Sequence, residues 1–405
     1  MQRAKMTTYR NEARREIYPA PAAPLPAALP GYAGHGYYDL TPIKHSHYKW
    51  NTALAFLSTQ IAGGSQIIAT VADLRGQNRR MVRAGRYLAV AGGMNSAAIL
   101  IAALHTPRRW YNMLRIFKKS SPMSIGIWSI SPFTFFSGLA AAGQVAADIG
   151  YTRSGNWAGR AFSLPAALLG SVAIAYMGTE LEETNMPAWA SAYPLMAPLY
   201  ACAGVSNAAA ALLLFPMHNG TCGATTASIK KLAFVSGAAE LALGAVLDGH
   251  WRRSAEASAI AQSRYEPWYR IGFLGIGMLG SLALRLWDRF DTNRSRVSNA
   301  ASVLKLAGAM VQQTVLVYAG QESGRRARDY FAYTREPKIG NNAEHADQPA
   351  DHAKKSAGSA GKDRATRTLP KARRSSSRSA VAWGLFACGA LLISAAVLRK
   401  KESSR

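Results

Sequence analysis

The sequence predicts an all-α membrane protein: a bundle of eight transmembrane helices, expected as two packed four-helix bundles, with a separate transmembrane helix near the C-terminus. Three observations lead to this fold class. Long uncharged apolar windows alternate with short basic ones along the 405 residues. The net charge is +26, yet most Lys and Arg residues stand just outside the apolar windows. The segment 105–124 joins two such windows and combines five Lys/Arg residues with Trp110 and Tyr111, as membrane-interface segments do.

The eight spanning helices are placed where apolar windows are long enough to cross the hydrocarbon core, about 20 residues. Pro132 lies inside the third helix and is tolerated because neighbouring helices can satisfy the freed carbonyl. Lys305, Gln312 and Gln313 interrupt the eighth window, so a soluble amphipathic helix is the alternative there. The predicted helices cover residues 52–72, 87–105, 125–147, 162–181, 191–215, 231–249, 269–287 and 303–320.

Small residues recur inside these helices at spacings that favour close helix contact. Glycine lets two backbones approach within dispersion range, which a lipid-facing Leu surface does not. The pattern therefore predicts one compact bundle over residues 51–320. The glycines concerned are Gly63, Gly64, Gly92, Gly93, Gly272, Gly275, Gly277 and Gly280.

The segments outside the bundle differ from it in composition. Residues 1–50 are polar, basic and rich in Pro and Ala. Residues 321–378 carry fourteen Lys/Arg and almost no large apolar side chain, which predicts a flexible basic linker. Residues 379–399 include the nineteen uncharged residues 380–398, about 28 Å of helix, and predict the final transmembrane helix, followed by a basic tail at 400–405.

The cation count of the loops predicts the orientation in the membrane. With the N-terminus inside, the cytoplasmic segments of the bundle carry fifteen Lys/Arg and the opposite segments eleven. The fourteen cations of the linker fall on the same side as the N-terminus. We therefore expect a multi-pass protein of the inner (cytoplasmic) membrane, with the N-terminus and the basic linker in the cytoplasm.

Composition also argues against several kinds of partner and cofactor. The cations do not accompany a nucleic-acid-binding motif, so membrane lipid rather than nucleic acid is the expected partner. No His lies at membrane depth, which argues against haem, and Cys202, Cys222 and Cys388 are too far apart to suggest an iron–sulfur cluster or a metal site. We expect no haem, no iron–sulfur cluster and no metal in this chain.

Polar side chains inside the helices are the candidate functional residues, because each is costly in lipid and should face the bundle interior. Glu240 is the most informative, since its apolar flanks place it near mid-membrane. Gln and Asn could instead serve as hydrogen-bonded contacts between helices. Asp73 and Asp248 stand near helix ends and are expected to pair with Arg75 and Arg252. The full set is Gln60, Gln66, Asn95, Gln144, Asp148, Glu180, Asn207, Glu240, Gln312 and Gln313.

Three motifs resemble the NrfD/PsrC family of membrane subunits of polysulfide reductase-type oxidoreductases. Residues 109–118 read RWYNMLRIFK and residues 121–128 read SPMSIGIW, similar to the connector between the second and third helices of the family. Residues 176–189, YMGTELEETNMPAW, resemble the family's fourth-helix end. A weaker match covers Tyr37, Tyr38, Asp39 and the Gly63–Ser65 stretch. The resemblance extends over roughly residues 36–337.

This resemblance implies a quinone- or quinol-interacting subunit of a respiratory oxidoreductase. Such a subunit anchors an iron–sulfur, ferredoxin-like partner and commonly serves a molybdopterin catalytic subunit, which carries the substrate half-reaction. A quinol head group needs a hydrogen-bonding group for each oxygen and a proton acceptor. Gln60, Gln144 and Asp148 are accordingly our quinone-binding candidates, and Glu180 and Glu240 our proton-relay candidates.

Two other functions remain alternatives at this point. An eight-helix bundle with buried carboxylates is also compatible with a proton channel or a transporter, although we find no internal repeat of the kind transporters show. A non-catalytic membrane scaffold whose basic tail binds anionic lipid is the third reading.

Overall fold

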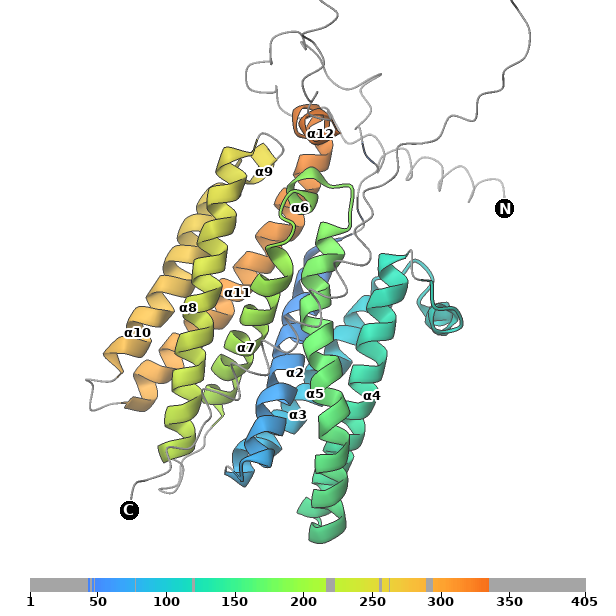
Figure 1. The fold of residues 1–405 in the computed structure, drawn as a ribbon, viewed down its shortest axis with the longest axis vertical. Helices are drawn as coiled ribbons and strands as arrows, with labels where there is room; N and C mark the ends of the chain where they lie inside the picture. The colour runs from blue at the N-terminus through green and yellow to red at the C-terminus, as the bar shows by residue number, and fades with distance from the viewer. Residues whose placement is uncertain are drawn as a thin grey trace, which may run out of the picture.

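The computed structural model describes residues 43, 46, 48–76, 78–118, 121–215, 223–254, 257–261, 263–288 and 294–334. Within these residues, all regular structure is helical, which confirms the predicted all-α class. Figure 1 shows the long helices side by side in two groups, α2 to α5 in one and α7, α8, α10 and α11 in the other. The first group is α2 (Trp50–Leu74), α3 (Arg79–Ala102), α4 (Pro122–Asp148) and α5 (Thr152–Glu182).

The second group is built from α7 (Met196–Leu214), α8 (Gly223–Arg253), the π-helix η4 (Trp268–Gly280) continued by α10 (Ser281–Trp287), and α11 (Arg294–Arg325). Seven helices of the described chain are long and apolar enough to span a membrane, counting η4 with α10 as one. The helix α3 meets that test only together with η2 (Pro107–Leu114), from which it is bent by 112°. The arginines in its first two turns, among them Arg79, Arg80 and Arg83, shorten its apolar length.

We call the end of the bundle where α2 begins the N face and the other end the far face. The short helices α6 (Pro187–Ala190), α9 (Ser258–Ala261) and α12 (Ala327–Thr334) gather at the N face (Figure 1). Because successive spans alternate in direction, the N face also holds η2, the start of α4 and the end of α5. The far face holds the end of α2 and the turn between α4 and α5.

The helical bundle extends further along the chain than predicted. We expected it to end at residue 320, with flexible linker from 321, but α11 runs to Arg325 and α12 follows. Tertiary contacts order this stretch: the Asp329 carboxylate accepts a hydrogen bond from the Ala259 backbone N–H at 3.0 Å, and the Ser323 hydroxyl accepts one from the Ala188 N–H at 3.2 Å. The rest of the predicted linker, the predicted helix 379–399 and most of residues 1–50 lie outside the described residues.

Glycines mark the places where helices approach most closely, as their spacing predicted. A methyl group on Gly64 of α2 would lie 2.2 Å from the carbonyl oxygen of Gly204 in α7. A methyl group on Gly277 of η4 would lie 2.6 Å from the Cα of Gly308 in α11. At both crossings only a hydrogen atom fits between the two backbones, so larger side chains would force the helices apart.

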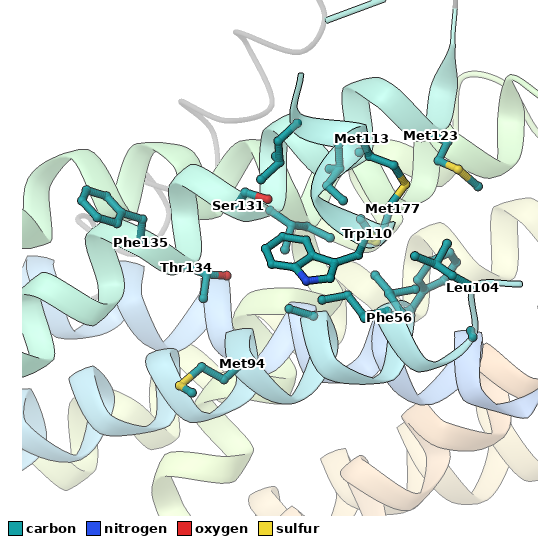
Figure 2. Close-up of a pocket in the computed structure, with 18 of the residues that line it drawn as sticks. Phe56, Met94, Leu104, Trp110, Met113, Met123, Ser131, Thr134, Phe135 and Met177 are labelled. Atoms are coloured by element: carbon teal, nitrogen blue, oxygen red, sulfur yellow. The ribbon is translucent and has the colours of Figure 1, made fainter. Parts of the chain in front are cut away.

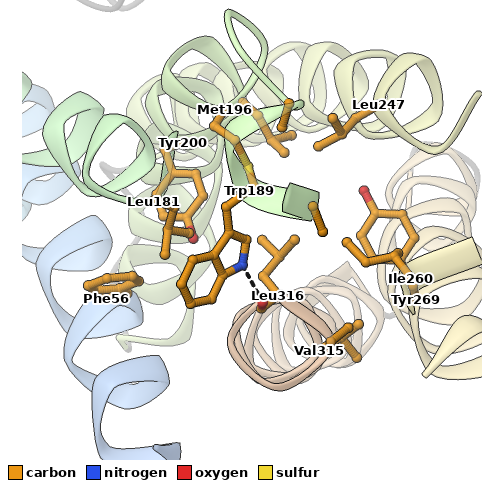
Figure 3. Close-up of a cluster of buried hydrophobic side chains, with 14 of the residues drawn as sticks. Phe56, Leu181, Trp189, Met196, Tyr200, Leu247, Ile260, Tyr269, Val315 and Leu316 are labelled. Carbon is orange, nitrogen blue, oxygen red and sulfur yellow. Dashed lines mark hydrogen bonds between the residues drawn. The ribbon is translucent and has the colours of Figure 1, made fainter. Parts of the chain in front are cut away.

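The fully buried side chain of Trp189 joins the two helix groups at the N face (Figure 3). It comes from α6, and its Nε1–H donates to the Leu316 carbonyl of α11 at 2.7 Å. Leu181, Met196 and Tyr200 belong to the same cluster, so α5, α6, α7 and α11 meet around one ring. This cluster fixes the end of α5, and with it the position of the functional site.

Candidate functional site

A cavity of about 640 Å³ lies in the first helix group, at the N face. The side chains of α2, α3, α4, α5 and η2 form its walls, and most of them are apolar. Figure 2 shows the indole of Trp110 projecting from η2 among these side chains. The lining includes Thr52, Phe56, Val90, Met94, Leu100, Leu104, Trp110, Met113, Met123, Ile130, Ser131, Thr134, Phe135, Leu139 and Met177.

The cavity continues as a groove between α3 and α4 toward the outer surface of the bundle. Met94 of α3 and Phe135 of α4 both line it, yet they are 60% and 62% exposed. Because these helices span the membrane, side chains exposed at mid-helix face lipid. The groove therefore gives the cavity a lateral opening toward the hydrocarbon of the bilayer.

The polar end of the cavity is formed by Tyr48 and Glu180. The Tyr48 hydroxyl donates a hydrogen bond to the Glu180 carboxylate at 2.8 Å, and both residues line the cavity. Burial, together with the neighbouring carboxylate, raises the pKa of the Tyr48 phenol above its ordinary value, so the hydroxyl remains a donor at neutral pH. The tyrosine ring packs on Trp189, with 5.8 Å between centroids, and this contact holds it at the cavity wall.

A second set of polar side chains lies between the two helix groups, away from the cavity. Glu240 of α8 is fully buried and Lys305 of α11 is 2% exposed. The Lys305 ammonium lies 3.2 Å from the Glu240 carboxylate and also donates to the Asn207 side-chain carbonyl of α7. The ion pair joins α8 and α11, and the hydrogen bond to Asn207 adds α7.

This ion pair continues into a chain of side-chain hydrogen bonds toward the N face. The Asn207 amide donates to the Gln60 Oε1 of α2 at 2.9 Å. The Gln313 amide donates to the same oxygen at 3.3 Å, and the Tyr200 hydroxyl donates to the Gln313 Oε1 at 2.7 Å. Tyr200 in turn packs edge-on against Phe56, which lines the cavity.

A third polar cluster lies at the far face. The Asp73 carboxylate accepts hydrogen bonds from the buried Arg86 at 2.8 Å and from Arg160 at 3.1 Å. Arg86 also donates to the Gln144 Oε1 at 2.9 Å, and the Gln144 amide donates to Asp148 at 3.0 Å. The cluster ties the far ends of α2, α3, α4 and α5 together.

The structure separates the residues that the sequence grouped as one site. Of the candidates, Glu180 lines the cavity, whereas Gln60 and Glu240 belong to the central network. Gln144 and Asp148 belong to the far-face cluster and do not meet Gln60. Asp248 accepts from Arg252 at 3.0 Å as predicted, but Asp73 pairs with Arg86 and Arg160 and not with the expected Arg75.

Sequence reasoning missed Tyr48, Trp110 and Lys305 as members of these sites. In the sequence, Lys305 interrupts an otherwise apolar window. Its charge, opposite to that of Glu240 in another apolar window, was a signal for a buried pair, because a lone charge at membrane depth is costly. Within the described residues, no group of three or more His, Cys, Asp and Glu could hold a metal ion.

A comparison with protein families supports the resemblance seen in the motifs. The NrfD family model described as polysulfide reductase matches residues 35–326, more than half of the chain. The chain belongs to the NrfD polysulfide reductase family. Members of this family are membrane subunits that associate with other oxidoreductase subunits, so this NrfD protein is a multi-pass membrane subunit of that general kind. Among curated proteins, none matches the chain.

Proposed function

We propose that this NrfD protein exchanges electrons and protons between a quinone pool and an iron–sulfur partner subunit, and that the cavity at the N face binds the quinone. The observation that carries the proposal is the pairing of one polar end, Tyr48 with Glu180, with an apolar cavity that opens laterally to lipid. A quinone has the same division, with a polar ring and an apolar isoprenoid chain. The volume of about 640 Å³ lies in the usual range for small-molecule sites.

In this proposal, the ring lies against Tyr48 and Glu180 and the chain leaves along the α3–α4 groove. When the ring binds, the Tyr48 hydroxyl turns its single proton from Glu180 to one ring oxygen, and the freed Glu180 carboxylate accepts the proton that a quinol hydroxyl releases. Oxidation of one quinol releases two electrons and two protons, and the electrons pass to the partner. The three residues first considered for the ring, Gln60, Gln144 and Asp148, do not line this cavity.

The onward route that we propose for protons leads through the central network to Glu240. Hydrogen bonds link the region beside the cavity to the Lys305–Glu240 pair, through Tyr200, Gln313, Gln60 and Asn207 in turn. Glu180 would act first and Glu240 second. Ionisable side chains inside a membrane bundle commonly mark such routes.

We further propose that the N face is cytoplasmic and that the iron–sulfur partner docks there, close to the ring-binding end of the cavity. The substrate half-reaction then belongs to partner subunits, a molybdopterin catalytic subunit among them. This placement agrees with the position of the polar end of the cavity and with the cation-rich N-terminal segment.

The test is quinol oxidation by membranes that contain the intact complex. We expect Glu180→Gln to lower kcat about 100-fold or more, the usual effect of losing a general base, and Tyr48→Phe to weaken quinol binding. Glu183→Gln is the matched control, because Glu183 is an exposed carboxylate three residues away that does not line the cavity. Wild-type rates in Glu180→Gln would contradict the assignment of the site.

A further inference from the structure

The segment between α3 and α4 carries cations that have no partner within the described part of the chain. We call residues 105–118 the connector. Four of its cations are exposed, namely Arg108, Arg109, Arg115 and Lys118. None of these four side chains makes an ion pair or a hydrogen bond with a described residue. Six other arginines of the bundle contact a carboxylate, namely Arg83, Arg86, Arg160, Arg252, Arg270 and Arg326.

The connector lies at the N-face end of the bundle, between the end of α3 and the start of α4. Its helix η2 is bent by 112° from α3, so it runs across the direction of the spans (Figure 1). Ile116 is 74% exposed, and the Phe117 ring packs edge-on against Trp128, an exposed residue of the spanning helix α4. The apolar part of the connector therefore faces the same lipid as α4.

Apolar and cationic side chains thus occupy one exposed surface. Trp, Tyr and Phe prefer the boundary between hydrocarbon and head groups, and Arg and Lys at that depth meet lipid phosphates. The exposed aromatic rings of the connector favour a lipid over an acidic protein as the occupant, because they continue the lipid-facing surface of α4.

We propose that the connector is a binding site for the head group of an anionic phospholipid, held by Arg108, Arg109, Arg115 and Lys118. The site adjoins the cavity, because Trp110, Met113 and Leu114 of the same helix form part of the cavity wall. A bound lipid would hold η2 in place and so keep that wall formed. Binding of the lipid does not require the proposed quinone function, and the two can fail separately.

The experiment uses the purified full-length protein in detergent micelles with brominated phospholipids, which quench tryptophan at short range. The contribution of Trp110 is the difference between wild type and Trp110→Phe. We expect brominated phosphatidylglycerol to quench this contribution at a lower mole fraction than brominated phosphatidylcholine. The double variant Arg108→Gln/Arg109→Gln should weaken that preference about 30-fold, which corresponds to about 2 kcal/mol for two cations.

One further double variant serves as a control and another as a second test. Arg79→Gln/Arg80→Gln removes the same charge from exposed positions at the far face and should keep the preference. Arg115→Gln/Lys118→Gln should weaken it, which tests the site independently if the first double variant does not fold. Equal quenching by both lipids in wild type would overturn the proposal, as would an unchanged preference in both connector variants. Displacement of the lipid by millimolar inorganic phosphate would show a free-phosphate site and overturn the lipid assignment.

Discussion

Replacing Lys305 by Met should lower the free energy of unfolding of this protein by about 3–5 kcal/mol, the usual cost of breaking a buried ion pair from one side. The magnitude follows from burial: Glu240 is fully buried and Lys305 is 2% exposed, so neither water nor lipid can solvate the charge that remains. The reciprocal change Glu240→Leu should cost a similar amount, because it leaves the ammonium with only the Asn207 carbonyl.

The double variant Lys305→Met/Glu240→Leu separates the pair interaction from the general cost of changing these positions. Two apolar side chains leave no unpaired charge, so the double variant should be more stable than the sum of the two single losses implies, and more stable than either single variant. The assay is unfolding of the purified protein in mixed micelles with increasing SDS. Strictly additive losses, or a Lys305→Met variant as stable as wild type, would refute the argument that these charges are paired in a dry interior.

The same unfolding assay tests three other contacts. Gly64→Ala should destabilise the bundle by about 1–3 kcal/mol or more, because the added methyl meets a carbonyl oxygen of α7 at 2.2 Å, whereas Gly138→Ala, with open space around it, should be close to neutral. Asp73→Asn should cost about 3–5 kcal/mol by leaving the buried Arg86 guanidinium without its charge partner; a loss below 1 kcal/mol would contradict this. Trp189→Phe should cost about 0.5–1.5 kcal/mol, since the Leu316 carbonyl of α11 loses the hydrogen bond from the indole, and an unchanged stability would mean that the bond contributes nothing.

The eight predicted spans of the bundle correspond in order to long helices, although α3 meets the test for a span only together with η2. The ends of the helices differ from the predicted ends in a systematic way. Most spans are longer than the apolar window that revealed them; α5, for example, begins at Thr152 although the window begins at residue 162. Helix ends at the interface carry polar and basic residues that hydropathy counts against a span. At the N face, α6 and α12 were not predicted, because contacts from α9 and α11 order them.

The site residues show where prediction from sequence stops. Glu180 and Glu240 were recognised because a carboxylate in an apolar window is conspicuous in any single helix. Their partners were not: Tyr48 is 132 residues from Glu180, and Lys305 is 65 residues from Glu240. Gln144 and Asp148 were grouped with Gln60 because all three are polar, although they lie in different clusters.

The sequence by itself determined that the chain crosses the membrane repeatedly, several of the glycines at helix contacts, and which family the chain resembles. These properties are local. A helix must satisfy its own backbone hydrogen bonds in lipid, so a spanning helix can be recognised from the length of its apolar segment. Only the tertiary structure decided which polar groups meet, where the cavity lies and which cations remain unpaired. When a helix is apolar on every side, its sequence does not show which face turns toward the bundle interior. Packing against the other helices decides that face, and with it the partners of the buried polar side chains.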